Sequence, residues 1–186
     1  MACWMLALGA AAAAAGARAP TEYVDEETGA TVTVVSEPLV FAHERPGSVR
    51  RTRDFVTLAA ASVDQMGKIS YVLIGYFWSA GVFFDERSEN ARLAREPLVL
   101  QLQDRRIELA PRSARDAGIG VPVHRPPYGS ATPTVYAIDL QTMQLIAEST
   151  RPSLHSGGAG TSLSYELLDD QLAALRELVR HLNAPS

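Results

Sequence analysis

Four arginines stand close together in one nine-residue stretch: Arg45, Arg50, Arg51 and Arg53. A guanidinium group can bind a phosphate or a carboxylate through two parallel hydrogen bonds. Four such groups on one loop predict a site for an anionic ligand, such as a lipid headgroup or an acidic glycan. Glu44 and Asp54 flank the cluster, and a solvated loop is the alternative explanation of the same charge run.

A second candidate site is the long connection between residues 112 and 130, which is rich in glycine and proline. Loops of more than ~15 residues in a compact domain are usually functional or disordered, and disorder is the alternative here. The connection carries side chains suited to ligand binding: Arg112, Arg115, His124, Arg125 and Tyr128. Phe83 and Phe84 follow a separate apolar run, and as exposed side chains they would contact a partner.

Serine hydrolysis needs a serine that a histidine base makes nucleophilic, and its usual local sign is a G-x-S-x-G turn. The sequence contains no such turn. Ser153, His155 and Ser156 precede a glycine-rich stretch, and Asp139 or Asp169 could complete a triad in the fold. A flexible loop explains the same residues without catalysis, so a hydrolase is the alternative and not the leading interpretation.

The four histidines, His43, His124, His155 and His181, lack the short spacings of metal-binding motifs. The glycines at 157–160 do not form a phosphate-binding loop, because they neither follow a strand nor precede a Lys-Ser or Lys-Thr pair. We therefore expect no metal and no cofactor.

The composition indicates one folded domain that does not bind nucleic acid. Of the 186 residues, 47% are hydrophobic and 20% are charged, a balance typical of globular proteins. Although 17 residues are basic, the net charge is −4, so the overall field does not favour polyanions.

The first nineteen residues are typical of a removable export signal. An uncharged, alanine-rich run follows Cys3 and ends at Ala17-Arg18-Ala19, which resembles a cleavage site. The run is shorter than the ~20 residues of a membrane-spanning helix. The basic residues that normally begin such a signal are missing, so we expect that the true start lies upstream, and that Cys3 carries a lipid only if that start makes it a lipobox cysteine. The mature chain contains no other cysteine and therefore no disulfide.

Downstream of an exposed acidic segment at 20–29, alternating apolar residues predict a single β-rich domain over 30–183. The strongest signal is a hairpin formed by residues 54–63 and 69–79 around a turn that contains Gly67. A second hairpin is predicted over residues 97–110, with its turn at Asp104-Arg105. Shorter strands are predicted over 30–35 and 38–42.

The last third of the chain predicts two similar strand-helix units. A strand over 133–138 leads to Asp139, a favourable first cap of a helix that ends near Ser149. A strand over 163–168 leads to a closing helix over about 169–183, with Asp169 or Asp170 as its cap. Tyr136 and Tyr165 mark a constant offset of 29 residues between the units.

These observations predict a mostly β (α+β) fold: an antiparallel β-sandwich with a short helix near 139–149 and a C-terminal helix near 169–183. The order of elements over about residues 97–183, with its closing helix Asp170-Gln171-Leu172-Ala173-Ala174-Leu175, resembles the exported invasion-associated locus B proteins. This resemblance is architectural and implies no functional residues. We expect a non-catalytic periplasmic or secreted module that binds an envelope component or a protein partner.

Overall fold

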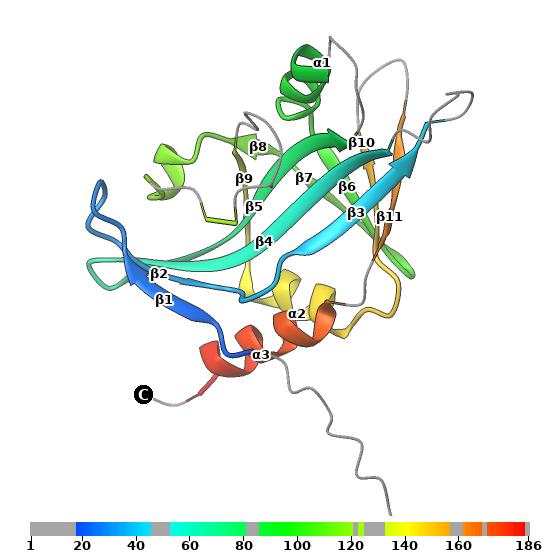
Figure 1. Cartoon of the computed structure of the whole chain (residues 1–186). Helices are drawn as coiled ribbons and strands as arrows, with labels where there is room; N and C mark the ends of the chain where they lie inside the picture. The colour runs from blue at the N-terminus through cyan, green and yellow to red at the C-terminus, as the bar shows by residue number, and fades with distance from the viewer. Residues whose placement is uncertain are drawn as a thin grey trace, which may run out of the picture.

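The computed structural model describes residues 18–45, 53–80, 86–120, 123–124, 133–156, 162–168 and 171–184. Within these ranges the chain forms a mostly β fold, in which one antiparallel sheet is nearly closed into a barrel (Figure 1). The described strands are β1 (Thr21–Val24), β2 (Thr31–Val34), β3 (Leu39–Glu44), β4 (Arg53–Gln65), β5 (Lys68–Ala80), β6 (Leu98–Leu102), β7 (Arg105–Leu109), β8 (Pro111–Arg112), β9 (Thr134–Ile138), β10 (Ser153–Ser156) and β11 (Ser164–Leu167).

The described helices lie at opposite ends of the barrel. Helix α1 (Glu86–Leu93) covers one end, whereas α2 (Leu140–Glu148) and α3 (Leu172–Leu182) lie together at the other end (Figure 1). A short 3-10 helix, η1 (Arg115–Ala117), follows β8. The mostly β class, the short helix and the C-terminal helix are confirmed, and the predicted sandwich takes the form of a single curved sheet because β10 and β11 link β6 to β3.

The central hairpin is longer than the sequence predicts, and its turn is shorter. Strands β4 and β5 pair along thirteen residues each, from Arg53 opposite Ala80 to Gln65 opposite Lys68. Only Met66 and Gly67 form the turn, both with positive φ. The twist of two such long strands carries them around the core, and this curvature helps the sheet approach closure.

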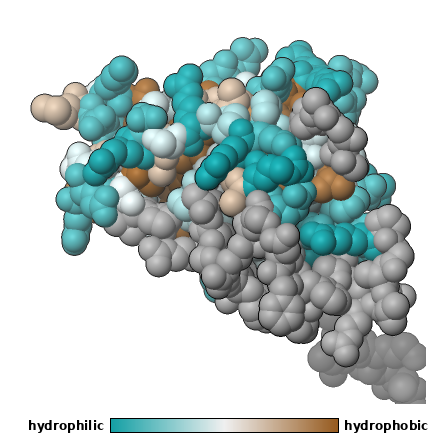
Figure 2. Space-filling view, turned by 90° about the horizontal axis from the view of Figure 1, so that it is seen from above, coloured by the Kyte–Doolittle hydropathy of each residue, from teal (hydrophilic) through white to brown (hydrophobic). Residues whose placement is uncertain are grey.

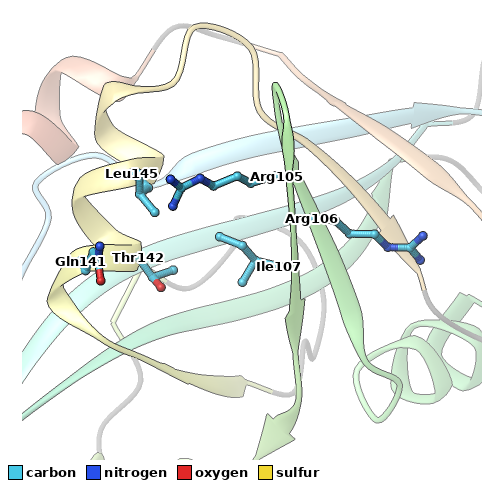
Figure 3. A pocket seen from close by; sticks show the side chains of 6 residues that line it. All are labelled: Arg105, Arg106, Ile107, Gln141, Thr142 and Leu145. Atoms are coloured by element: carbon cyan, nitrogen blue, oxygen red, sulfur yellow. The ribbon is translucent and has the colours of Figure 1, made fainter.

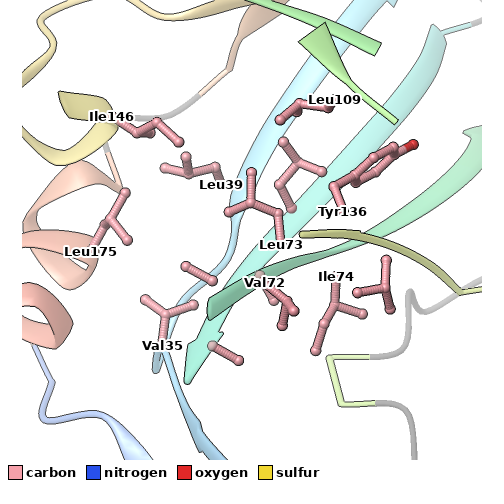
Figure 4. Close-up of a cluster of buried hydrophobic side chains, with 14 of the residues drawn as sticks. Val35, Leu39, Val72, Leu73, Ile74, Leu109, Tyr136, Ile146 and Leu175 are labelled. Atoms are coloured by element: carbon pink, nitrogen blue, oxygen red, sulfur yellow. The ribbon is translucent and has the colours of Figure 1, made fainter. Parts of the chain in front are cut away.

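The core lies between the inner face of the sheet and the apolar faces of α2 and α3. Ile146 of α2 and Leu175 of α3 point toward the strand residues Leu39 and Leu73 (Figure 4). Seen from above, the described surface is mostly hydrophilic, with apolar side chains showing between the polar ones (Figure 2).

The strand and the helix of both predicted strand-helix units are present: β9 with α2, and β11 with α3. Tyr136 of β9 and Tyr165 of β11 are both fully buried. Asp139 caps α2 by accepting a hydrogen bond from the Thr142 N–H, at 2.6 Å. The predicted caps Asp169 and Asp170 lie outside the described residues, and the residue that precedes α3 is Gln171, which caps the helix with no side-chain hydrogen bond.

The N-terminal segment is only partly the exposed stretch that its acidic composition predicts. Asp25 is buried, and its carboxylate accepts hydrogen bonds from the N–H groups of Glu27, Thr28 and Gly120, at 2.9–3.0 Å. Because the carboxylate is shared between two segments of the chain, it fixes the β1–β2 turn to the segment that follows η1.

Candidate functional site

The described arginines of the first predicted site bind carboxylates of the protein itself. Arg45 donates from Nε and from a terminal nitrogen to the two carboxylate oxygens of Asp54, at 2.6 and 2.8 Å. Arg53 donates to the Glu44 carboxylate at 2.7 Å. Cross-strand pairing brings these partners together, since Glu44 lies directly opposite Arg53. Arg50 and Arg51 lie outside the described residues, so an anion site that includes them stays a prediction.

Asp54 is the centre of a buried polar network at the α1 end of the barrel. Asp54 is 3% exposed, and its carboxylate also accepts a hydrogen bond from the Ser79 hydroxyl at 2.7 Å. Asn90 of α1 in turn donates to the Ser79 hydroxyl at 3.3 Å. The network therefore ties the ends of β4 and β5 to α1, and it satisfies a carboxylate that burial would otherwise destabilise.

A shallow hollow of about 430 Å³ lies on the outer face of β3 and β11, beside the Arg53–Glu44 pair. Its polar lining includes His43, Ser164 and Glu166. The His43 ring packs against Tyr165 at 5.6 Å, and its Nδ1 donates to the Ser164 carbonyl at 2.8 Å. Because its arginine is already neutralised by Glu44, this hollow offers little attraction to an anion.

The structure describes part of the second predicted site, over residues 112–120 and 123–124. Arg112 belongs to β8 and Arg115 to η1, and both side chains are exposed. The ring of His124 forms a 2.7 Å hydrogen bond with the Val35 carbonyl, so this histidine has a structural contact. Arg125, Tyr128, Phe83 and Phe84 lie outside the described residues. The part that is described covers one face of β5, where the Tyr76 hydroxyl donates to the Val123 carbonyl at 2.8 Å.

The candidate hydrolytic residues lie on a strand and not in a loop. Ser153 and His155 lie in β10, which pairs with both β6 and β11. Ser156 is buried, and its hydroxyl accepts a hydrogen bond from the Leu163 N–H at 3.0 Å. Among the described residues, no hydrogen bond joins a serine hydroxyl to a histidine ring.

A groove that the sequence did not reveal lies between β7 and α2, with a volume of about 350 Å³. Its lining residues combine arginine, apolar and uncharged polar side chains: Arg105, Arg106, Ile107, Gln141, Thr142 and Leu145. Figure 3 shows Arg105 and Ile107 extending from β7 toward α2, whereas Arg106 points away on the opposite face of the strand. A second hollow of about 220 Å³ shares Arg105 and Leu145 and extends the groove along the β6–β7 turn.

The alternation of β7 explains how an arginine enters this groove. Arg105, Ile107 and Leu109 share the inner face of the sheet, where Leu109 is buried. The turn of the hairpin is Gln103-Asp104, so Arg105 is already the first residue of the strand. The sequence contained a signal for this position, because Arg105 is two residues before Ile107 and four before Leu109 and therefore shares their face of the strand. The predicted turn at Asp104-Arg105 hid this signal.

The electrostatics of the groove favour an anion. Neither Arg105 nor Arg106 forms an ion pair or a side-chain hydrogen bond within the described part of the chain. The 350 Å³ groove has no carboxylate among its lining residues. The adjoining hollow, which Arg105 also lines, contributes the carboxylates of Asp104 and Glu148.

The described residues include no group of three His, Cys, Asp or Glu side chains placed to hold a metal ion. None of the helices in the described ranges is long and apolar enough to cross a membrane.

Comparison of the chain with protein-family models, with curated proteins and with solved structures finds no match. The resemblance to invasion-associated locus B proteins therefore stays a prediction.

Proposed function

We propose that this protein is a non-catalytic periplasmic or secreted binding module, and that the groove between β7 and α2 is its ligand site. The observation that carries the proposal is that Arg105, which extends toward α2, and Arg106, on the opposite face of β7, have no ion-pair partner among the described residues, at a groove whose lining has no carboxylate. A ligand that carries carboxylates would supply the missing partners.

The other side chains of the groove support binding of a ligand that is larger than a simple anion. Ile107 and Leu145 give it apolar walls, while Gln141 and Thr142 offer an amide and a hydroxyl. Small binding sites commonly combine apolar walls with a few polar groups, in volumes of about 300–1,000 Å³. The groove lies within this range and matches this composition.

The affinity of an acidic probe tests the proposed site. The probe is a capped peptide, Thr-Val-Thr-Asp-Glu-Thr-Val-Thr, followed by fluorescence anisotropy. We expect Arg105→Gln to weaken binding at least tenfold, because it removes the guanidinium that faces α2. The matched control is Arg115→Gln, since Arg115 is exposed and lies outside the groove. Equal loss in both variants, or no binding by the wild-type protein, would contradict the proposed site.

Export is the second part of the proposal, and it is supported by the apolar leader that ends at Ala17-Arg18-Ala19. We expect protein recovered from the periplasm or the medium to begin near Pro20 when its mass is measured. Recovery of the whole chain from the cytoplasm, with Met1 retained, would contradict export.

A further inference from the structure

Strand β7 is the terminal strand of the described sheet, and one of its edges is unpaired. It pairs with β6 alone among the described strands. Two residues close this hairpin, so the flanking pair Leu102–Arg105 is hydrogen-bonded and every second pair after it is also bonded. The hydrogen bond from the Ser156 N–H to the Leu163 carbonyl shows that Ser156 of β10 faces β11, so that its neighbour His155 faces β6. The residues of β6 that do not bond β10 are then the ones that bond β7, in agreement with the alternation in the hairpin.

The alternation identifies which backbone groups are unused. Arg105, Ile107 and Leu109 direct their N–H and C=O groups toward β6. The N–H and C=O groups of Arg106 and Glu108 therefore point to the open side. A strand edge of this kind is a template for pairing with another extended chain.

The open edge lies at the seam of the barrel, beside the groove. Strand β8 closes the seam only at Pro111 and Arg112, which pair with β9. Below this point the edge of β7 that faces away from β6 has no strand partner in the described sheet, and α2 lies across the groove from it (Figure 3). The unused backbone groups and the Arg105 side chain therefore lie at the same opening, and Arg106 lies on the other face of the strand.

We propose that an extended acidic segment of a partner protein adds to β7 as a further strand. The inference rests on the proposed ligand site and specifies its ligand. Side chains of an added strand alternate between the two faces of the sheet, as Arg105 and Arg106 do. Two neighbouring acidic residues in the segment would consequently reach both arginines, one on each face.

A second copy of this chain is the competing occupant, because Arg106 and Glu108 would pair with each other across a two-fold axis. The space favours a short segment. The groove has a volume of about 350 Å³ and is open at the surface, so an extended segment can lie along it. Folded copies need roughly 800 Å² of buried surface from each partner, and α2 lies beside the edge on which that contact would form.

Peptide binding by the Glu108→Pro variant distinguishes strand addition from simple charge attraction. Glu108→Pro removes an N–H that points away from β6, and proline is tolerated at such positions on edge strands. Its matched control is Glu108→Ala, which removes the same carboxylate and keeps the N–H. We expect the acidic peptide to bind the alanine variant at least as tightly as wild type, because a like charge is removed, and to bind the proline variant at least tenfold more weakly than the alanine variant.

Hydrogen exchange of the wild-type protein provides the second measurement and does not depend on the folding of a variant. Saturating peptide should slow exchange of the Arg106 and Glu108 amides at least tenfold, with little change at Arg105 and Ile107, which already face β6. Peptide that binds without this protection and binds both variants at position 108 equally would overturn strand addition while leaving the anion site intact. A dimer that forms without peptide and is lost in Glu108→Pro would overturn it in favour of a second copy.

Discussion

The Arg45 guanidinium holds the buried carboxylate of Asp54 through two hydrogen bonds, at 2.6 and 2.8 Å. This pairing makes Arg45 part of the framework that joins β3, β4 and α1. The site proposed for ligand binding lies elsewhere, at arginines that have no such partner among the described residues.

The contribution of the Arg45–Asp54 pair should therefore be measurable in the free energy of unfolding. Arg45→Ala leaves a carboxylate that is 3% exposed without its cation, and because Arg45 is itself partly exposed and Ser79 still donates to Asp54, the loss should be about 1–3 kcal/mol. Arg53→Ala breaks the exposed pair with Glu44 and should cost less than ~1 kcal/mol. Urea unfolding of both variants measures the difference, and equal losses would argue against a structural role for Asp54.

Gly120 should not tolerate a side chain. A Cβ atom there would lie 2.5 Å from the Glu27 Cβ and 2.8 Å from an Asp25 carboxylate oxygen. Gly120→Ala must displace the backbone and weaken the N–H contact to Asp25, a change expected to lower stability by about 1–3 kcal/mol. Thermal unfolding should show no comparable loss for the exposed neighbour variant Glu26→Ala; an unchanged midpoint in Gly120→Ala would contradict the described packing.

The hydroxyls of Tyr136 and Tyr165 are buried without a hydrogen-bond partner among the described residues. Replacing each with phenylalanine removes an unsatisfied polar group, so we expect stability at pH 7 to be unchanged or raised by about 1 kcal/mol. Chemical unfolding of Tyr136→Phe and Tyr165→Phe measures this directly. A loss of more than ~1 kcal/mol would indicate that the hydroxyl has a partner.

The same tyrosines predict a loss of stability at alkaline pH. Burial raises the pKa of both hydroxyls, and the negative charges of Asp54 and Glu89 raise the pKa of Tyr165 further. Above about pH 10 the unfolded chain releases these protons while the folded chain retains them, so stability falls as pH rises. Each Tyr→Phe variant should lose less stability than wild type between pH 9 and about 11; parallel pH profiles would contradict the assignment.

Asp139 should stabilise α2, and with it one wall of the groove. Asp139→Ala removes the hydrogen bond from the Thr142 N–H and should cost about 1 kcal/mol at neutral pH. The hydrogen bonds with Thr142 lower the pKa of Asp139, so the contribution is present above the unfolded pKa of about 3.9 and disappears as pH falls through the folded pKa. Unfolding of wild type and variant from pH 2 to pH 7 should converge at the acid end, whereas Asp116→Ala, on exposed η1, should follow wild type throughout.

Local sequence patterns predicted the elements that carry a clear periodicity. The central hairpin has long apolar runs on both sides of a glycine turn, the second hairpin has alternating apolar residues, and α2 has a cap at Asp139 with Met143, Ile146 and Ala147 facing inward. Strand β10 was missed because Leu154 is the only apolar residue in Ser153–Ser156, and its pairing with two distant strands creates the signal. Helix α1 was missed because it lacks an apolar stripe.

The groove could not be predicted because it depends on long-range placement. The sequence identifies the hairpin of β6 and β7 and the helix α2 separately, but not that Leu145 lies across a groove from Ile107. In the sequence, the arginine cluster at 45–53 indicated an anion site more strongly than Arg105 and Arg106 did. In the structure, however, Asp54 and Glu44 supply the partners of its described members.

The location of the bound probe tests the central claim most directly. The acidic peptide can carry a nitroxide spin label at one end, and amide signals of the ¹⁵N-labelled protein broaden near the label. We predict broadening along β7 and at Gln141, Thr142 and Leu145 of α2. Broadening confined to the surroundings of Arg45 and Arg53, or of Arg112 and Arg115, would contradict a binding site between β7 and α2.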